Sequence, residues 1–371
     1  MILTTCAACA APLAHDAPRC VRCKTRYCDS TCQHDHWRRG HKQICKKIHR
    51  GGNAEQYHAD QKYKEAVAVA VEACADDTKG QTCFICTEAL HWKTKEGIVR
   101  MCACRGTSGF AHVSCLAEQA KILVTETEEN NLGPKVLDVR WARWDTCGLC
   151  EQRYHDVVCC ALGWACWKTY QERPETDQVR QMAMNLFGNG LSLANHNEDA
   201  LSVQEAELSM LRRLGVSEYN ILIAQGNLSC TYYALGRVEE ALYLRRDVYV
   251  GRLKLNGEEH QHTLLAANNI ASLLKELRHF KEAKWLLRKK MPVARRVLGE
   301  SNDLTLRMRW VYAETLYEDP DATLDDLCEA VSTLEETART AKRVLGGEHP
   351  LAEAIAYYLQ KARWALGART G

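Results

Sequence analysis

Apolar residues recur at three- and four-residue steps through most of the second half of the chain, which is the spacing of amphipathic helices. A glycine closes each pair of predicted helices, at positions 215, 257, 299 and 346, so the pattern repeats at 42, 42 and 47 residues. Glycine at this position suits the left-handed conformation that ends many helices. A two-helix unit repeated at this length predicts an α-helical solenoid. We expect units at residues 178–216, 217–258, 259–300 and 301–347, closed by a helix at residues 352–366.

The first half of the chain has helical periodicity in shorter stretches. Residues 55–74 contain neither Gly nor Pro, and Tyr63, Val67 and Ala70 fall on one apolar face, which predicts a connecting helix. Residues 156–174 predict a second, bridging helix with apolar flanks. This helix carries the three cysteines Cys159, Cys160 and Cys166. A metal site would need a fourth ligand, which is missing, so we interpret them as small buried side chains. The fold class is therefore mostly α.

Cysteine is the unusual feature of the composition. Eighteen of the 20 cysteines lie in the first 166 residues, and many form Cys-x2-Cys pairs interleaved with histidine. This arrangement favours metal binding over disulfides and indicates a reducing compartment, cytoplasm or nucleus. The net charge of +2 gives no general argument for nucleic acid or a membrane surface, and no run of 18 apolar residues predicts a spanning helix.

Residues 83–150 contain four ligand pairs. They comprise seven thiols and one imidazole: Cys83 and Cys86, Cys102 and Cys104, His112 and Cys115, and Cys147 and Cys150. Zinc in a structural site takes four such ligands in a tetrahedron, so eight ligands make two sites. The order of the pairs along the sequence leaves their grouping open.

This ligand series, with a single residue between Cys102 and Cys104, resembles the RING-CH variant of RING fingers. The resemblance implies a cross-braced fold with two zinc sites: Cys83, Cys86, His112 and Cys115 hold one ion, and Cys102, Cys104, Cys147 and Cys150 hold the other. It also implies that Ile85 and Trp144, with Trp141 as an alternative, contact a ubiquitin-conjugating enzyme, although Trp144 suits a core position equally well. A PHD finger, which reads a histone tail, has the same ligand order but wider spacing between its third and fourth ligands.

Two departures weaken the ligase interpretation. The 31 residues between Cys115 and Cys147 are longer than the family's usual segment, and residues 117–127 of it look helical. Ligases also commonly carry a basic residue directly after the last zinc ligand, where this chain has Glu151.

Residues 6–45 contain a second series of eight ligands. The pattern Tyr27-Cys28-x3-Cys32 followed by Gly40-His41-x3-Cys45 resembles a MYND zinc finger. The resemblance implies interleaved ligands: Cys6, Cys9, Cys28 and Cys32 on one zinc, and Cys20, Cys23, His41 and Cys45 on another. His34 and His36 are alternative ligands, and Trp37 is expected in the small apolar core. MYND fingers bind short proline-containing peptides.

Residues 19–50 include ten Lys or Arg and two Asp. A nucleic-acid patch would explain this charge, but aromatic residues for stacking are few. We therefore favour a solvated face that steers protein partners.

The repeats resemble the tetratricopeptide repeats of kinesin light chains, whose inter-repeat turn matches Gly257-Glu-Glu-His260. The resemblance implies that Asn185, Asn227 and Asn269 clamp the backbone of an extended peptide in a concave groove. Hydrogen bonding between neighbouring helices is the other interpretation of these asparagines, and the sequence does not decide between them.

No nucleophile elbow, phosphate loop or dinucleotide fingerprint occurs, and each predicted metal site is closed by four protein ligands. We therefore expect a protein-interaction adaptor that binds four Zn2+ ions and has protein or peptide partners and no membrane partner. The alternative is a RING-type ubiquitin ligase, which needs no covalent catalytic residue of its own. A nucleic-acid-binding regulator is a third, less favoured alternative that rests only on the basic residues of 19–50. The expected segments are a MYND finger (1–50), a connecting helix (51–80), a RING-CH-like finger (81–155), a bridging helix (156–174) and repeats with a cap helix (175–371).

Overall fold

The computed structural model describes residues 5–14, 16–102, 104–347 and 349–370. The protein is mostly α, and β structure among the described residues is limited to four isolated antiparallel bridges. Contacts between residues divide the chain into two compact units, Met1–Gly215 and Val216–Gly371. No helix within the described ranges is long and apolar enough to cross a membrane.

The first unit combines two cysteine-rich segments with helices. Its first helices are short and belong to the N-terminal segment: α1 (Ser30–His36), the segment η1 (Trp37–His41), which is kinked at Gly40 with a φ of 130°, and α2 (Lys42–Arg50). The others are α3 (Ala54–Ala73), α4 (Ala75–Thr78), α5 (Val113–Glu129), α6 (Pro134–Trp141), η2 (Ala142–Trp144), α7 (Asp156–Tyr170), α8 (Gln178–Leu193) and α9 (Asn197–Leu214).

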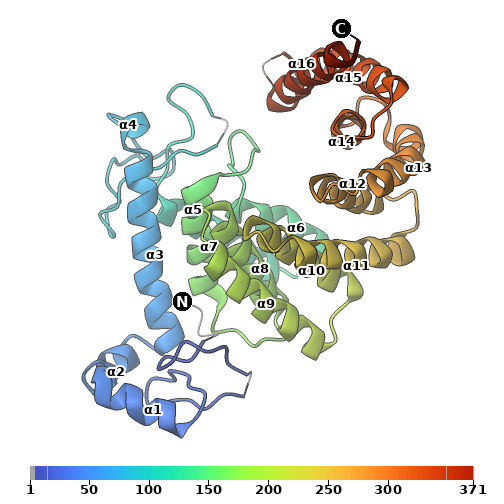
Figure 1. Ribbon diagram of the computed structural model, residues 1–371. Coiled ribbons are helices and arrows are strands. Elements are labelled where there is room, and N and C mark those ends of the chain that lie inside the picture. The colour runs from blue at the N-terminus through green and yellow to red at the C-terminus, as the bar shows by residue number, and fades with distance from the viewer. Residues whose placement is uncertain (1–4, 15, 103, 348, 371) are drawn as a thin grey trace. The chain divides into compact units, whose positions relative to one another are not determined.

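Helix α3 joins the two cysteine-rich segments (Figure 1). At its N-terminal end the Ala54 amide donates to the carbonyl of Cys23 at 2.7 Å. Farther along, the Tyr63 and Ser114 hydroxyls lie 3.1 Å apart, and the thiol that follows the helix, Cys74, donates to the Arg100 carbonyl. Twenty helical residues span about 30 Å, so α3 is a rigid spacer with one end on each segment.

Helix α7 is the core of the first unit. All but a few of its side chains are buried, including Cys159, Cys160 and Cys166. Burial raises the pKa of Cys159 to about 11 and that of Cys160 to about 12, so both remain neutral thiols at physiological pH. These cysteines pack as small apolar side chains.

Glycines allow α7 and α8 to pack closely. A Cβ at Gly190 of α8 would lie 2.9 Å from the Cys159 carbonyl oxygen, and a Cβ at Gly163 of α7 would lie 3.3 Å from the Phe187 Cα. Both neighbours are backbone atoms that cannot turn away. The first predicted repeat, α8 with α9, therefore packs against α7 and is grouped with the N-terminal unit.

Replacing Gly190 with Ala is expected to destabilise the first unit by about 1–3 kcal/mol, because backbone must shift to admit the methyl group. Gly226→Ala is the matched control, since nothing lies within 4 Å of its Cβ position in a helix. The control should stabilise the second unit by about 0.5–1 kcal/mol through helix propensity. Urea unfolding of both variants measures the difference; equal effects would contradict the close approach.

The second unit is a run of antiparallel helices: α10 (Glu218–Ala234), α11 (Val238–Asn256), α12 (Gln261–Glu276), α13 (Phe280–Leu298), α14 (Asp303–Tyr317), α15 (Leu324–Leu345) and α16 (Pro350–Thr370). Buried Leu, Ala and Ile from α11 to α16 form one continuous core. The longer third spacing has two structural causes: α15 has 22 residues where α13 has 19, and the turn before it, residues 318–323, is longer than the corresponding turn at residues 277–279. The buried turn residue Asp319 also caps its own loop by accepting from the Asp321 amide.

Candidate metal centres and repeat surfaces

Cysteine and histidine side chains gather in four groups of four. Within each group the candidate ligand atoms all lie within 4.8 Å of one another. Each group combines residues from two distant parts of its segment, which is the interleaving that the resemblances imply. The groups are Cys6, Cys9, Cys28 and Cys32; Cys20, Cys23, His41 and Cys45; Cys83, Cys86, His112 and Cys115; and Cys102, Cys104, Cys147 and Cys150.

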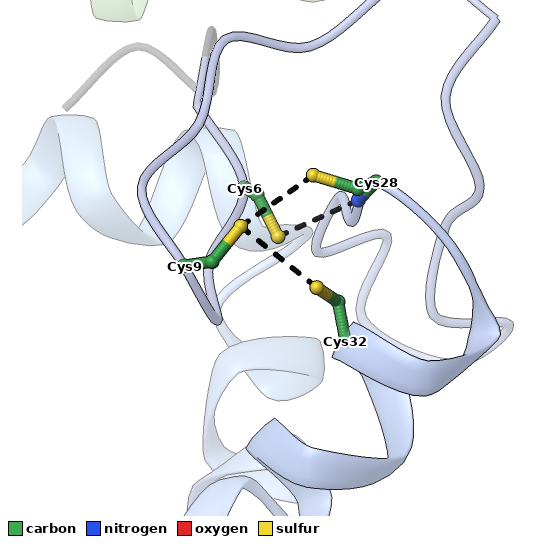
Figure 2. A group of neighbouring side chains, drawn as sticks. All are labelled: Cys6, Cys9, Cys28 and Cys32. Carbon is green, nitrogen blue, oxygen red and sulfur yellow. Dashed lines mark hydrogen bonds between the residues drawn. The ribbon is translucent and has the colours of Figure 1, made fainter.

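The first group has the dimensions of a zinc site. Figure 2 shows four sulfur atoms facing one another, two from an N-terminal loop and two from the segment that enters α1. Cys9 Sγ lies 3.5 Å from Cys28 Sγ and 3.8 Å from Cys32 Sγ. A tetrahedral zinc with bonds of about 2.3 Å separates its sulfurs by about 3.8 Å, whereas a disulfide requires about 2.05 Å. These residues therefore fit zinc.

The second group is buried throughout and includes an imidazole. His41 Nε2 lies 3.3 Å from Cys23 Sγ, and Cys20 Sγ lies 3.8 Å from Cys45 Sγ. His36 is outside the group: it stacks on His41 with ring centroids 4.8 Å apart, and its Nδ1 lies 3.0 Å from the Tyr27 hydroxyl. The structure thus places His41, and neither His34 nor His36, among the four.

The expectation that Trp37 fills the core of this finger is wrong. Trp37 is 39% exposed, while Tyr27 is fully buried. Tyr27 packs with the four most buried Cys of the two groups, and with Ile48 and Ala54. Trp37 and Tyr27 were both possible aromatic residues for this small core, and the sequence does not show which of them faces inward.

The central segment holds the third and fourth groups. His112 Nδ1 lies 3.3 Å from Cys86 Sγ and 3.6 Å from Cys115 Sγ, close to the separation of about 3.6 Å that a shared zinc would give. His112 Nε2 lies 3.3 Å from the Ala89 carbonyl oxygen, an acceptor that fixes the tautomer with a free Nδ1. In the fourth group Cys104 Sγ lies 3.7 Å from Cys147 Sγ.

The four Cys-x2-Cys pairs share one backbone turn. The residue after each pair has a positive φ of 57° to 65°: Ala10, Lys24, Thr87 and Glu151. The amide of that residue donates to the carbonyl of the first cysteine, as from Glu151 to Cys147 at 3.0 Å. Amides inside the turn also point at sulfur, as from Ile85 to Cys83 Sγ at 3.4 Å. Donors aimed at sulfur stabilise thiolates, the form that binds metal.

The same turn recurs once without cysteines. The amide of Lys95 donates to the His91 carbonyl at 2.9 Å, and Lys95 has a φ of 59°. Thr94 occupies the place of the second ligand, and its hydroxyl lies 2.9 Å from His91 Nδ1. A hydrogen bond therefore closes this turn where a metal would close the others.

The thiols within the four groups differ in their electrostatics: burial and neighbouring thiols raise the pKa of some, such as Cys32 and Cys104, whereas backbone amides lower the pKa of others. Burial opposes ionisation of Cys6, but the amides of Ala8, Cys9 and Cys28 outweigh it and lower its pKa to about 6. Cys150 behaves alike: burial is outweighed by the Gln152 amide and neighbouring thiols, and its pKa falls to about 7. Burial without such donors raises the pKa of Cys166 far above its usual range.

The three asparagines with a predicted role in peptide binding differ in their surroundings. Asn185 donates to Glu207 Oε1 at 3.0 Å and accepts from Asn189 at 3.2 Å, so it belongs to a buried network between α8 and α9. Asn227 is half-buried on α10. Asn269 is exposed on α12, and its backbone carbonyl oxygen accepts a hydrogen bond from the Arg245 guanidinium at 2.8 Å. Of the three, only Asn269 is exposed.

Glu207 is a buried carboxyl held by one amide. Burial raises its pKa to about 7, and the Asn185 N–H offsets only part of that shift. The folded-state pKa exceeds the unfolded value of about 4.3, so this group destabilises the fold progressively as pH rises from about 4.3 to 7. The cost above pH 7 is on the order of 3 kcal/mol.

Glu207→Gln is therefore expected to stabilise the first unit by about 1–3 kcal/mol at pH 8 and by little at pH 5. Urea unfolding followed by tryptophan fluorescence, with zinc present, measures both values. A gain of equal size at the two pH values would show that the carboxyl is not buried in this way.

Of the two predicted contacts for a conjugating enzyme, one is on the surface. Ile85 is 37% exposed. Trp144 is fully buried, packing against Trp141 and Tyr170 with ring centroids about 6 Å apart (6.3 and 5.8 Å). The prediction for Trp144 is therefore corrected: helices α5 and α6, which form the long segment between Cys115 and Cys147, enclose it together with α7.

Two family models match parts of the chain. The model of the MYND finger matches residues 6–45, and the model of the tetratricopeptide repeat matches residues 221–262 and 263–303. No curated protein matches the chain. The chain therefore carries a MYND zinc finger and tetratricopeptide repeats, both of them modules of protein interaction. These matches leave residues 83–150 uncovered, so the RING-CH resemblance stays a prediction.

Solved structures of repeat proteins are similar to part of the chain. The putative kinesin light chain TPR-like repeats of Podosopora anserina share 23% identity with a TM-score of 0.45, covering 53% of this chain and 90% of theirs. A variant of the same repeats with one substitution shares 16% identity with a TM-score of 0.43, covering 62% and 97%. BtubC (BKLC) from P. vanneervenii shares 14% identity with a TM-score of 0.39, covering 69% and 92%.

Proposed function

We propose that the chain is a zinc-dependent protein-interaction adaptor that holds four zinc ions. The observation that carries the proposal is the set of four closed ligand groups beside two kinds of peptide-binding module. Bound zinc supplies cross-links within each finger. With four protein ligands at each ion, no coordination position is left for a reacting molecule.

The MYND finger and the repeats supply two separate peptide sites in this proposal. On α12 an exposed stripe runs through Gln261, Leu265, Asn269 and Glu276, at steps of four, four and seven residues along one helix face. Such a stripe can contact an extended peptide, with the Asn269 amide bonding to its backbone. The finger takes a proline-containing peptide, as its family implies.

Selection of random peptides displayed on phage against the zinc-loaded full chain tests this proposal. We expect selected peptides of two kinds, one for the finger and one for the repeats. The Asn269→Ala variant should bind the second kind about tenfold more weakly, because it loses a hydrogen bond to the peptide backbone. Ser332→Ala, an exposed polar change on α15, is the matched control and should leave binding unchanged. Failure to select any peptide would contradict the adaptor function.

The alternative function, a RING-CH-type ubiquitin ligase, is favoured by one observation. Phe84 and Ile85, inside the first turn of the central finger, are 36% and 37% exposed, where a conjugating enzyme would contact them. The burial of Trp144 and the acidic Glu151 count against it. A ubiquitin-transfer assay with a panel of conjugating enzymes decides: chains formed by wild type and lost in Ile85→Ala, at unchanged zinc content, would establish the ligase.

We further propose a reducing compartment, cytoplasm or nucleus, as the site of action. All twenty cysteines, each within the described part of the chain, are free thiols. Fourteen of them belong to the four ligand groups, where only a reduced sulfur can bind zinc. Fractionation of cells expressing a tagged chain tests this placement, and recovery in a secreted fraction would contradict it.

A further inference from the structure

Arg252 of α11 is a buried cation without a counter-ion. The residue is 6% exposed, and its guanidinium carbon lies 4.5 Å from the centre of the Tyr219 ring. Its Nη1 has no hydrogen-bond partner, and within the described ranges no carboxylate reaches it as an ion pair. Burial of an unpaired charge is strongly unfavourable, so such an arrangement points to a missing anion.

Two further unpaired donors lie near this guanidinium. Asn256 is one helical turn after Arg252 on the same face of α11, and its Nδ2 is buried without a partner. His262, the second residue of α12, has a buried and unpartnered Nδ1, and its ring centroid lies 6.2 Å from that of Tyr219. In the tautomer protonated at Nδ1, His262 is a third donor.

The surrounding charges favour an anion. Tyr219 and His262 each lie in the first turn of a helix, α10 and α12, and helix N-termini carry partial positive charge. The two acidic residues that lie between Asn256 and His262 in the sequence already have partners: Glu258 pairs with Lys290 at 2.6 Å, and Glu259 pairs with Arg296. Neither carboxylate neutralises Arg252.

We propose that Arg252, Asn256 and His262 bind a carboxylate group of an acidic partner peptide, against the face of Tyr219. The proposal rests on the peptide-binding function of the repeats and specifies the chemistry of one partner. A carboxylate fits better than a phosphate, because one negative charge balances the single permanent cation, whereas two would leave a net buried charge. The guanidinium fork also matches carboxylate geometry.

The cluster lies just beneath the surface. Tyr219 is 40% exposed and the neighbouring His260 is exposed, while Asn256 and His262 are half-buried. An acidic side chain or a C-terminal carboxylate from solvent meets the cluster at this partly exposed edge.

The first arm of the test needs no partner. The thermal midpoint of the zinc-loaded full chain is measured in sodium acetate, sodium phosphate and sodium chloride at equal ionic strength. We expect acetate to raise the midpoint above that in chloride in wild type but not in Arg252→Met. Arg246→Met is the control, since Arg246 is an exposed residue of the same helix that pairs with Glu282. No acetate effect would overturn the proposal, and a larger effect of phosphate would reassign the ligand.

The second arm uses the peptides selected on the repeats. We expect a shared Asp, Glu or free C-terminus, and a loss of affinity of about 10- to 100-fold when Arg252 becomes Met, as for a buried charge pair. Replacing the acidic group of the peptide with its amide should abolish the difference in peptide affinity between the wild type and Arg252→Met. Peptides that bind without an acidic group would overturn this inference and leave the adaptor function standing, whereas the absence of any peptide would contradict the adaptor function itself.

Discussion

Removal of zinc by a chelator is expected to unfold both cysteine-rich segments and to leave the second unit folded. The core around Tyr27 explains the first part, because four of its seven buried apolar residues are proposed ligands: Cys6, Cys20, Cys23 and Cys45. Structural zinc contributes about 10–16 kcal/mol in finger peptides, far more than so small a core supplies. The second unit has a continuous core of its own that contains no cysteine.

Hydrogen exchange with and without chelator measures this effect by segment. Amides in residues 5–50 and 81–155 should lose protection by orders of magnitude, including the Glu151 amide that closes the last turn. Amides of α12 and α14 should exchange at unchanged rates, which makes the second unit the internal control. Unchanged protection throughout would mean that the fingers fold without metal.

Replacement of single cysteines should separate ligands from packed thiols. Cys147 and Cys166 are both fully buried in the first unit, but only Cys147 belongs to a ligand group. Cys147→Ala should unfold the central finger and lower the zinc content by its two ions, because three ligands leave the fourth site open. Cys166→Ala removes one sulfur from an apolar core and should cost about 1–2 kcal/mol with full zinc content.

Zinc content by elemental analysis and the thermal midpoint are measured together on both variants. Equal effects of the two substitutions would contradict the assignment of the fourth group. A loss of zinc in Cys166→Ala would instead place a ligand on α7.

The sequence singled out the residues that the structure gathers into four groups, because paired cysteines at short spacing have few other uses in a reduced protein. It could not predict their grouping: Cys9 and Cys28 are 19 positions apart, yet their sulfurs lie 3.5 Å from each other. That grouping followed only from resemblance to known fingers. The common turn after each pair was also missed, since Ala, Lys, Thr and Glu at the left-handed position are not the residues that usually indicate it.

Errors arose where tertiary packing chooses between similar residues. Trp37 and Tyr27 are both aromatic neighbours of ligands, and only packing shows that Tyr27 is the buried one. Trp144 was a candidate surface contact that suited a core position equally well, and the helical segment between Cys115 and Cys147 encloses it. For Asn185 the sequence left a peptide clamp and a bond between helices both open, and in the structure its amide donates to the buried Glu207.

The unpaired donors at Arg252 could not be found from the sequence. An arginine on a surface helix is normally solvated, and its burial depends on how α10, α11 and α12 meet. Helical periodicity located these helices but gives no information on which cation lacks a counter-ion.

The most direct test of the account is the number of zinc ions in the full chain, measured by native mass spectrometry after purification under reducing conditions. The account predicts four ions for each chain, all lost together with the folded state of the fingers. Two ions would restrict metal binding to the MYND finger and contradict the proposal that the central segment is a second zinc-bound module.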